Sequence, residues 1–180
     1  MRKLIFGAVA AICLSACGST SGLKSMVGQS KPVLTSYDAV LVKTFVDGTE
    51  DQKLPPTAGA QFAKRIATAI RDSGRFDVVS RYAADTAGKT TLSIEGSIDR
   101  YEEGDEVLRY AMGILGKGKA YLDATVNIVD EASGEQLGVI EVDKNTSPLG
   151  GLVAAYQTTD VFMKGAGEKI AEELSEAKGK

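Results

Sequence analysis

Polar and apolar residues alternate along three stretches in the second half of the chain. The alternation runs through residues 90–101 and 120–128, and residues 135–142 repeat it after a polar Asp-Glu-Ala-Ser-Gly segment at 130–134. Successive side chains of a β-strand point to opposite faces, so a period of two indicates strands with one buried face. The polar segment between the last two stretches predicts a turn that joins them into a β-hairpin.

Two other stretches carry the spacing of amphipathic helices. The first begins after Thr57, the expected N-cap, and ends at Gly74, a helix-stop residue. Its apolar face consists of Phe62, Ile66, Ala69 and Ile70. The second is expected to be capped by Asp160. It directs Phe162, Met163, Ala166, Ile170 and Leu174 toward a core.

Apolar runs at residues 38–45 and 76–79 flank the first helix and are rich in β-forming residues. A strand, a helix and a second strand predict a right-handed crossover between parallel strands. We therefore predict a single α/β (α+β) domain over residues 37–178, with a mixed sheet of about five strands and two main helices.

Residues 1–16 have the features of an export signal. Arg2 and Lys3 supply positive charge, and the apolar run that follows is much shorter than the ~20 residues that span a bilayer. Small residues then precede Cys17, which resembles the bacterial lipobox. In such lipoproteins the cysteine sulfur carries diacylglycerol, a peptidase cuts before it, and the new amino terminus is acylated. The resemblance implies membrane attachment through Cys17; a plain signal peptide or an uncleaved anchor is the alternative.

Residues 17–36 are rich in Gly, Ser and Thr and show no hydrophobic period. This composition predicts a flexible tether, which the lipobox resemblance implies is lipidated at Cys17. In well-studied lipoproteins an aspartate after the lipidated cysteine favours retention in the inner membrane, whereas Gly18 stands there in this chain. The resemblance thus implies the outer membrane, with the domain facing the periplasm.

The composition limits the chemistry of the folded domain. The formal net charge is −3 with no basic block, which argues against a nucleic-acid surface. The chain has no histidine, and its two cysteines are Cys13, within the signal, and Cys17. Most nucleophile and metal sites need such groups, so we expect no enzyme activity, no metal and no other cofactor. A hydrolase that uses the carboxylates near Glu103 stays open as an alternative.

Two motifs imitate ligand-binding loops. The glycine cluster at 113–118, followed by Lys119, has P-loop spacing, but Ala120 replaces the Ser or Thr and opens a strand pattern where a helix is needed. We predict a bend or bulge that binds no nucleotide. The acidic run at 99–106 lacks the acids of a calcium loop at its third and twelfth positions, which favours a solvated turn between strands.

Four residues are candidates for contact with a partner: Arg109, Tyr110, Leu152 and Tyr156. Arginine is enriched at interaction hot spots, and Arg109 is a lone cation between Leu108 and Tyr110. Leu152 and Tyr156 belong to an apolar stretch of an irregular Gly-rich segment, which would mark an interface if it is exposed. An ion pair of Arg109 with nearby glutamates, and folding of the apolar stretch over the core, are the alternatives.

The joints between these elements resemble a known family. They are Tyr37 to Val40 with Phe45, Gly74 to Val79, Ile94 to Ile98, Arg109, Gly113, Gly116, Asp130 and Gly134. Over about Tyr37 to Leu174 this order is similar to the bacterial lipoprotein family called domain of unknown function 4410. The motifs are turns and strands, so the resemblance implies no catalytic residues.

The first strand, the helix and the second strand more distantly resemble the periplasmic domain of the curli secretion channel lipoprotein. Neither residues 106–118 nor 145–160 has the alternation of a membrane hairpin, which argues against pore formation. The leading hypothesis is a non-enzymatic binding or assembly component of the bacterial envelope, whose partner is a further envelope protein or a polymer. The alternative is a subunit of a curli-like secretion or export assembly.

Overall fold

The computed structural model describes residues 17–26, 28, 30–50, 54–112, 115, 118–146 and 156–179, and the expected signal at 1–16 lies outside them. Within these ranges the strands are β1 (Cys17–Thr20), β2 (Lys24–Ser25), β3 (Ala39–Val42), β4 (Val46–Asp47), β5 (Val78–Ser80), β6 (Thr91–Glu102), β7 (Tyr121–Asp130) and β8 (Gln136–Asn145). The helices are α1 (Ala58–Ser73), α2 (Glu106–Met112), α4 (Thr159–Lys178) and the 3₁₀ helix η1 (Ala83–Thr86).

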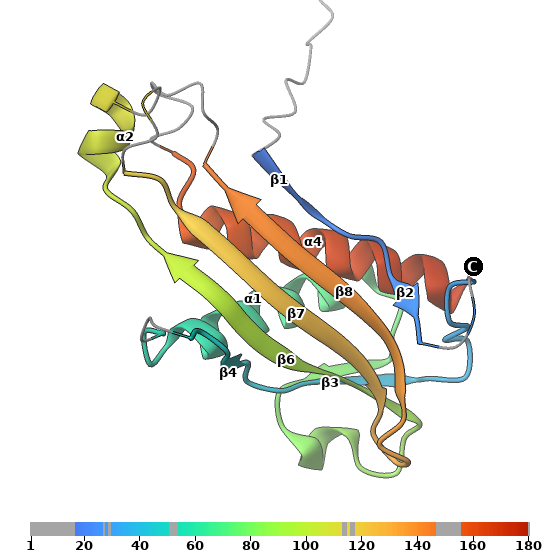
Figure 1. Ribbon diagram of the computed structural model, residues 1–180. Helices are drawn as coiled ribbons and strands as arrows, with labels where there is room; N and C mark the ends of the chain where they lie inside the picture. The colour runs from blue at the N-terminus through green and yellow to red at the C-terminus, as the bar shows by residue number, and fades with distance from the viewer. Residues whose placement is uncertain are drawn as a thin grey trace, which may run out of the picture.

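One mixed sheet contains all of these strands, in the order β1-β8-β7-β6-β3-β5. Figure 1 shows this order from β1 to β3. The short strand β2 pairs with β8, and β4 pairs with β6. The α+β class is confirmed, but the sheet has eight described strands and not about five. The additional strands are short pieces of two to four residues at the ends or edges, too short to produce a hydrophobic period.

The strand-helix-strand unit predicted from the first half of the chain is present. β3 pairs in parallel with β5 and with β6, and α1 connects β3 to β5. Thr57 is the N-cap of α1, although its side chain makes no capping hydrogen bond. Gly74 ends the helix with φ of 65°, a left-handed conformation that glycine adopts at little cost.

The start of α4 corrects one prediction. The N-cap is Thr158, whose hydroxyl accepts a hydrogen bond from the Val161 N–H, and not Asp160. Asp160 lies in the first turn, where a carboxylate also favours the positive end of the helix dipole. There it binds Arg65 of α1, with Nη2 to Oδ1 at 2.6 Å.

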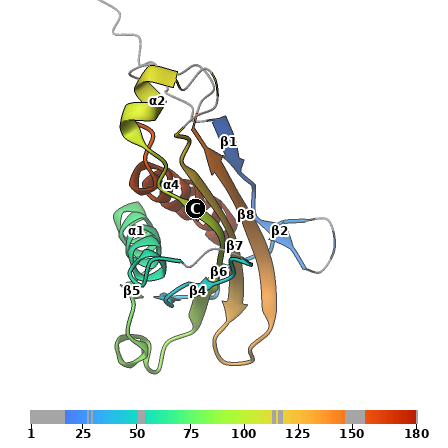
Figure 2. The same cartoon turned by 60° about the vertical axis from the view of Figure 1, so that its left-hand side comes forward.

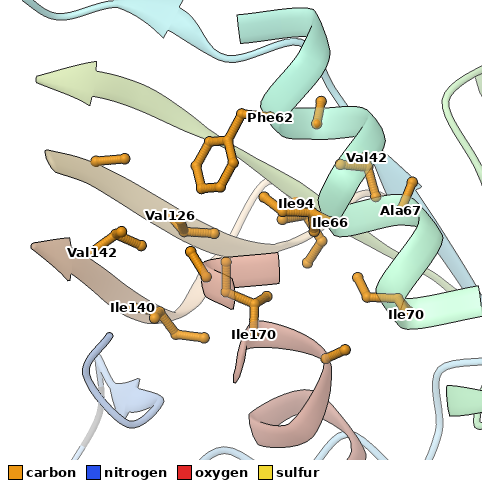
Figure 3. Close-up of a cluster of buried hydrophobic side chains, with 14 of the residues drawn as sticks. Val42, Phe62, Ile66, Ala67, Ile70, Ile94, Val126, Ile140, Val142 and Ile170 are labelled. Atoms are coloured by element: carbon orange, nitrogen blue, oxygen red, sulfur yellow. The ribbon is translucent and has the colours of Figure 1, made fainter. Parts of the chain in front are cut away.

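Both long helices cover the same face of the sheet, and the opposite face is left open (Figure 2). Figure 3 shows the core between the layers, where Phe62, Ile66 and Ile70 of α1 meet Ile170 of α4 and the inward side chains of the strands. The inward-facing residues predicted for α4 are all buried. Each large apolar side chain removed from water contributes about 1.5–3 kcal/mol, so this interface holds the domain together.

Residues 17–36 differ from the flexible tether that the sequence predicts. β1 pairs with β8 from Cys17↔Asn145 to Thr20↔Val142, and β2 continues along the same edge. Leu23 is 4% exposed and Leu34 fully buried, so this segment packs against the core through these two side chains. We call residues 17–26 and 30–34 the N-terminal strap.

Glu173 of α4 fastens this strap. Its Oε2 accepts hydrogen bonds from the Leu23 N–H at 2.9 Å and from Lys31 Nζ at 2.7 Å, and Lys169 Nζ lies 3.0 Å from its Oε1. Burial raises the pKa of the Glu173 carboxyl, but these donors outweigh burial and hold the pKa at about 2. The Glu173 carboxylate is therefore ionised at neutral pH.

Candidate partner-binding surface

Cys17 lies at one end of the sheet, in a row that crosses four strands. Cys17 of β1 is opposite Asn145 of β8, Asn145 is opposite Tyr121 of β7, and Tyr121 is opposite Glu102 of β6. At about 4.8 Å between strands, the row is roughly 14 Å long. The chain leaves its far end toward α2, so the candidate lipidation site and α2 share one end of the molecule, which we call the apical end (Figure 1).

A tightly packed loop connects β6 to α2. Gly104 has φ of 68°, and a Cβ there would lie 2.3 Å from the Gly118 carbonyl oxygen. The Asp105 N–H donates to that same carbonyl, and the Asp105 carboxylate accepts from the Leu108 N–H at 2.8 Å, which caps the helix. The acidic run therefore leads from a strand into a short helix, and the predicted turn between strands is wrong. An Asp three residues before an apolar residue was the signal for this cap.

The apical end carries exposed apolar and aromatic side chains. The exposed fractions are 75% for Val107, 39% for Leu108, 59% for Tyr110, 76% for Leu115 and 73% for Tyr156. Apolar side chains that gather at one exposed end of a domain favour a contact surface there. Val107, Leu108 and Leu115 were not among the predicted site residues. Leu115 lies within the glycine cluster at 113–118, and Val107 and Leu108 lie between that cluster and the acidic run at 99–106.

The four predicted partner-binding residues have different outcomes. Tyr110 of α2 and Tyr156, just before α4, are both exposed. Arg109 is in α2, but its side chain is outside what the structure describes, and so is Leu152. The Tyr101 hydroxyl donates to Glu103 Oε1 at 3.0 Å, in the loop between β6 and α2, and lies 3.2 Å from Thr159 Oγ1 at the start of α4. Tyr101 therefore joins the loop before α2 to the start of α4.

The glycine cluster leads into a strand, as predicted. β7 begins at Tyr121, and the preceding Ala120 N–H donates to Thr146 Oγ1 at 2.9 Å instead of facing a phosphate. Much of the cluster itself lies outside the described residues. In the described part of the chain, no three His, Cys, Asp or Glu residues are placed to hold a metal ion. No helix there is both long and apolar enough to cross a membrane.

The open face of the sheet is acidic, and we call it the outer sheet face. Its acidic residues are Glu95, Asp99, Glu102, Asp123, Glu141 and Asp143, and its basic residues are Lys24, Lys43 and Arg100. Lys43 bridges Glu95 at 2.9 Å and Glu131 at 3.0 Å. Arg100 binds Glu102 at 2.7 Å and stacks on the Tyr121 ring at 3.6 Å.

Asp123 and Asp143 face each other across β7 and β8, and Arg100 of β6, which is bound to Glu102, stands opposite Asp123 on its other side. Like charges directly opposite on neighbouring strands repel. Burial raises the pKa of the Asp123 carboxyl, and the charge of Asp143 adds to this. Asp123 Oδ1 has no hydrogen-bond partner among the described residues. An open hollow of about 630 Å³ adjoins Asp123 and is also lined by Glu50, Asp99, Glu102 and the cation Arg100.

The family model described as Domain of unknown function (DUF4410) matches residues 27–150. The chain belongs to this family. The resemblance seen in the sequence is thus confirmed. No curated protein matches the chain.

Among solved structures, a PelC dodecamer from Paraburkholderia phytofirmans is similar, with a TM-score of 0.55 and 16% identity over 84% of this chain and 98% of that one. A single-residue variant of the same dodecamer gives a TM-score of 0.55 and 20% identity, covering 91% of this chain and 99% of that one. At these identities the likeness establishes a shared fold over nearly the whole of the described domain.

Proposed function

We propose that this protein is a non-enzymatic assembly component of the bacterial envelope. It is held at the outer membrane by lipid on Cys17, faces the periplasm, and works as an oligomer of identical copies together with another envelope protein. The observation that carries the proposal is the strand register, in which Cys17 opens β1 at the end of the sheet that also bears the exposed residues of α2.

The apical end combines two features that suit this role. The strap holds Cys17 against β8, so lipid on Cys17 would keep the apical end near the membrane. Tyr110 and Tyr156 offer large, partly polar side chains of the kind that dominate protein interfaces. The likeness to a dodecamer supports the oligomer.

Fractionation of cells that express Cys17→Ser tests the anchor. Two or more acyl chains attach a protein stably, so the wild type is expected in the membrane fraction and the variant in the soluble fraction. Cys13→Ser, which changes the other cysteine, is the matched control and should stay with the membrane. A Cys17→Ser protein that still sediments with outer membranes after a salt wash would contradict the lipid anchor.

Photo-crosslinking in intact cells tests the partner surface. A crosslinking residue placed at Tyr110 or Tyr156 is expected to capture an envelope protein, whereas the same residue at the exposed Lys89 should not. Equal yields at all three positions would contradict the assignment of the apical end as the partner surface.

A further inference from the structure

Helix α1 lies on the side of the sheet opposite the outer sheet face (Figure 2), and its solvent-exposed residues form a basic surface. Its exposed charged residues, including the one just beyond its C-terminal glycine, are Lys64, Arg65, Arg71, Asp72 and Arg75. Arg65 is paired with Asp160. Arg71 donates to the Val79 carbonyl oxygen at 2.9 Å. Lys64 and Arg75 form no ion pair with any residue that the structure describes, so these two cations on this surface remain available.

The outer sheet face has the complementary charge, because some of its carboxylates lack a paired cation. Asp143 is exposed and makes no ion pair within the described ranges, and it stands opposite Asp123, whose Oδ1 lacks a hydrogen-bond partner. Asp99 is exposed beside them, where it accepts hydrogen bonds from Ser97 and Thr125. Arg100 stands opposite Asp123 but is bound to Glu102, so a further cation brought to this face would relieve the repulsion between Asp123 and Asp143.

We infer that the basic surface of α1 in one copy docks on the acidic outer sheet face of a second copy, with Lys64 and Arg75 meeting Asp99, Asp123 and Asp143. This inference rests on the proposed function, because it names the contact that builds the proposed oligomer.

The positions of the two surfaces determine the kind of assembly. They lie on opposite faces of one domain, so a copy cannot satisfy its own charges, and each contact leaves one surface free at either end. Such a head-to-tail contact is heterologous and produces a ring if the rotation between copies closes. Attachment to one membrane would raise the effective concentration of the copies, which allows a polar contact to suffice.

A charge swap tests this contact in the full-length, membrane-extracted protein. Lys64→Glu with Arg75→Glu, and separately Asp99→Lys with Asp143→Lys, are each expected to raise the concentration at which half of the oligomer dissociates by at least tenfold. The four changes combined should restore assembly. Native mass spectrometry gives the oligomeric state, and thermal melting shows that each variant is folded. Lys89→Glu, the reversal of an exposed lysine outside both surfaces, is the control and should assemble like the wild type.

The outcomes separate this contact from the proposed function. A wild type that is monomeric in the extract contradicts the proposed oligomer itself. Oligomers that persist in both reversed variants, or a combination that restores nothing, overturn this contact and leave the proposed function standing. An unchanged oligomer in which only the Asp99 and Asp143 variant loses binding to polylysine assigns the outer face to a cationic polymer, and that result also overturns the inference.

Discussion

Glu173 is a buried carboxylate whose neighbours are all donors. Its side chain is 5% exposed, and it holds Leu23 and Lys31 of the strap to α4. Its pKa in the folded protein, about 2, is below its ordinary 4.5. A depressed pKa means that the contribution of Glu173 to stability is complete above about pH 4.5 and is lost as the pH falls toward 2.

Glu173→Gln should therefore lower the free energy of unfolding by about 1–3 kcal/mol at pH 7, because hydrogen bonds to a charged group are replaced by weaker ones. The difference from the wild type should shrink as the pH is lowered to about 2. Glu176→Gln is the matched control, since Glu176 also binds Lys31 but is 54% exposed, and its loss should cost less than about 1 kcal/mol. Denaturant melts at several pH values provide the measurement. Equal losses of unfolding free energy in the two variants would contradict the role of Glu173 as the buried carboxylate that holds the strap to α4.

At the scale of secondary-structure elements, the sequence predicts the helices and strands that bury a long, regular apolar face. α1, β6, β7, β8 and α4 each carry enough apolar positions for the period of two or of 3.6 to be visible. β1 and β2 do not, because they are short edge strands whose mostly exposed residues are held by backbone pairing and by Leu23. Nothing in a local pattern indicates that Glu173, 150 residues away, accepts the Leu23 N–H.

The candidate site was only partly predictable for a related reason. Tyr110 and Tyr156 were identified by residue type, but α2 was not, since its described apolar side chains, Val107, Leu108 and Tyr110, are exposed and form no buried stripe. A helix without such a stripe is indistinguishable from a loop in a single sequence. The register that brings Cys17 to the same end as α2 depends on long-range strand pairing, which the sequence does not encode locally.

Hydrogen exchange distinguishes a docked strap from a flexible tether. The amides of Ser21, Leu23 and Met26 donate to Glu141, Glu173 and Leu137, so we expect them to exchange far more slowly than in a free chain. Leu23→Ala removes the apolar contact and should speed exchange in residues 17–26 while the amides of α1 stay unchanged. Wild-type exchange at the rate of a free chain in 17–26 would mean that the strap is not docked.

At the scale of the whole molecule, docking of the strap fixes the orientation of the domain relative to the proposed lipid anchor on Cys17. β7 has ten residues, so its two ends are separated by about 30 Å. Tyr110 belongs to the end that contains Cys17, whereas Ala132 lies in the β7–β8 turn at the opposite end. A flexible tether of about 20 residues would reach roughly 25 Å and would average this difference away. A strap paired with β8 from its first residue keeps the apical end close to the lipid.

Energy transfer to membrane acceptors tests this orientation. Cys17 is lipidated and Cys13 is removed with the signal in the proposed mature protein, so Tyr110→Cys and Ala132→Cys each offer a single thiol for a donor dye. On vesicles with acceptor-labelled lipid, transfer from position 110 should be much stronger than from position 132. Inserting ten Gly and Ser residues after Cys17 should reduce this difference without changing the melting temperature. Equal transfer from both positions in the uninserted protein would contradict an oriented domain, and a difference that survives the insertion would assign the orientation to the exposed residues of α2 and not to the strap.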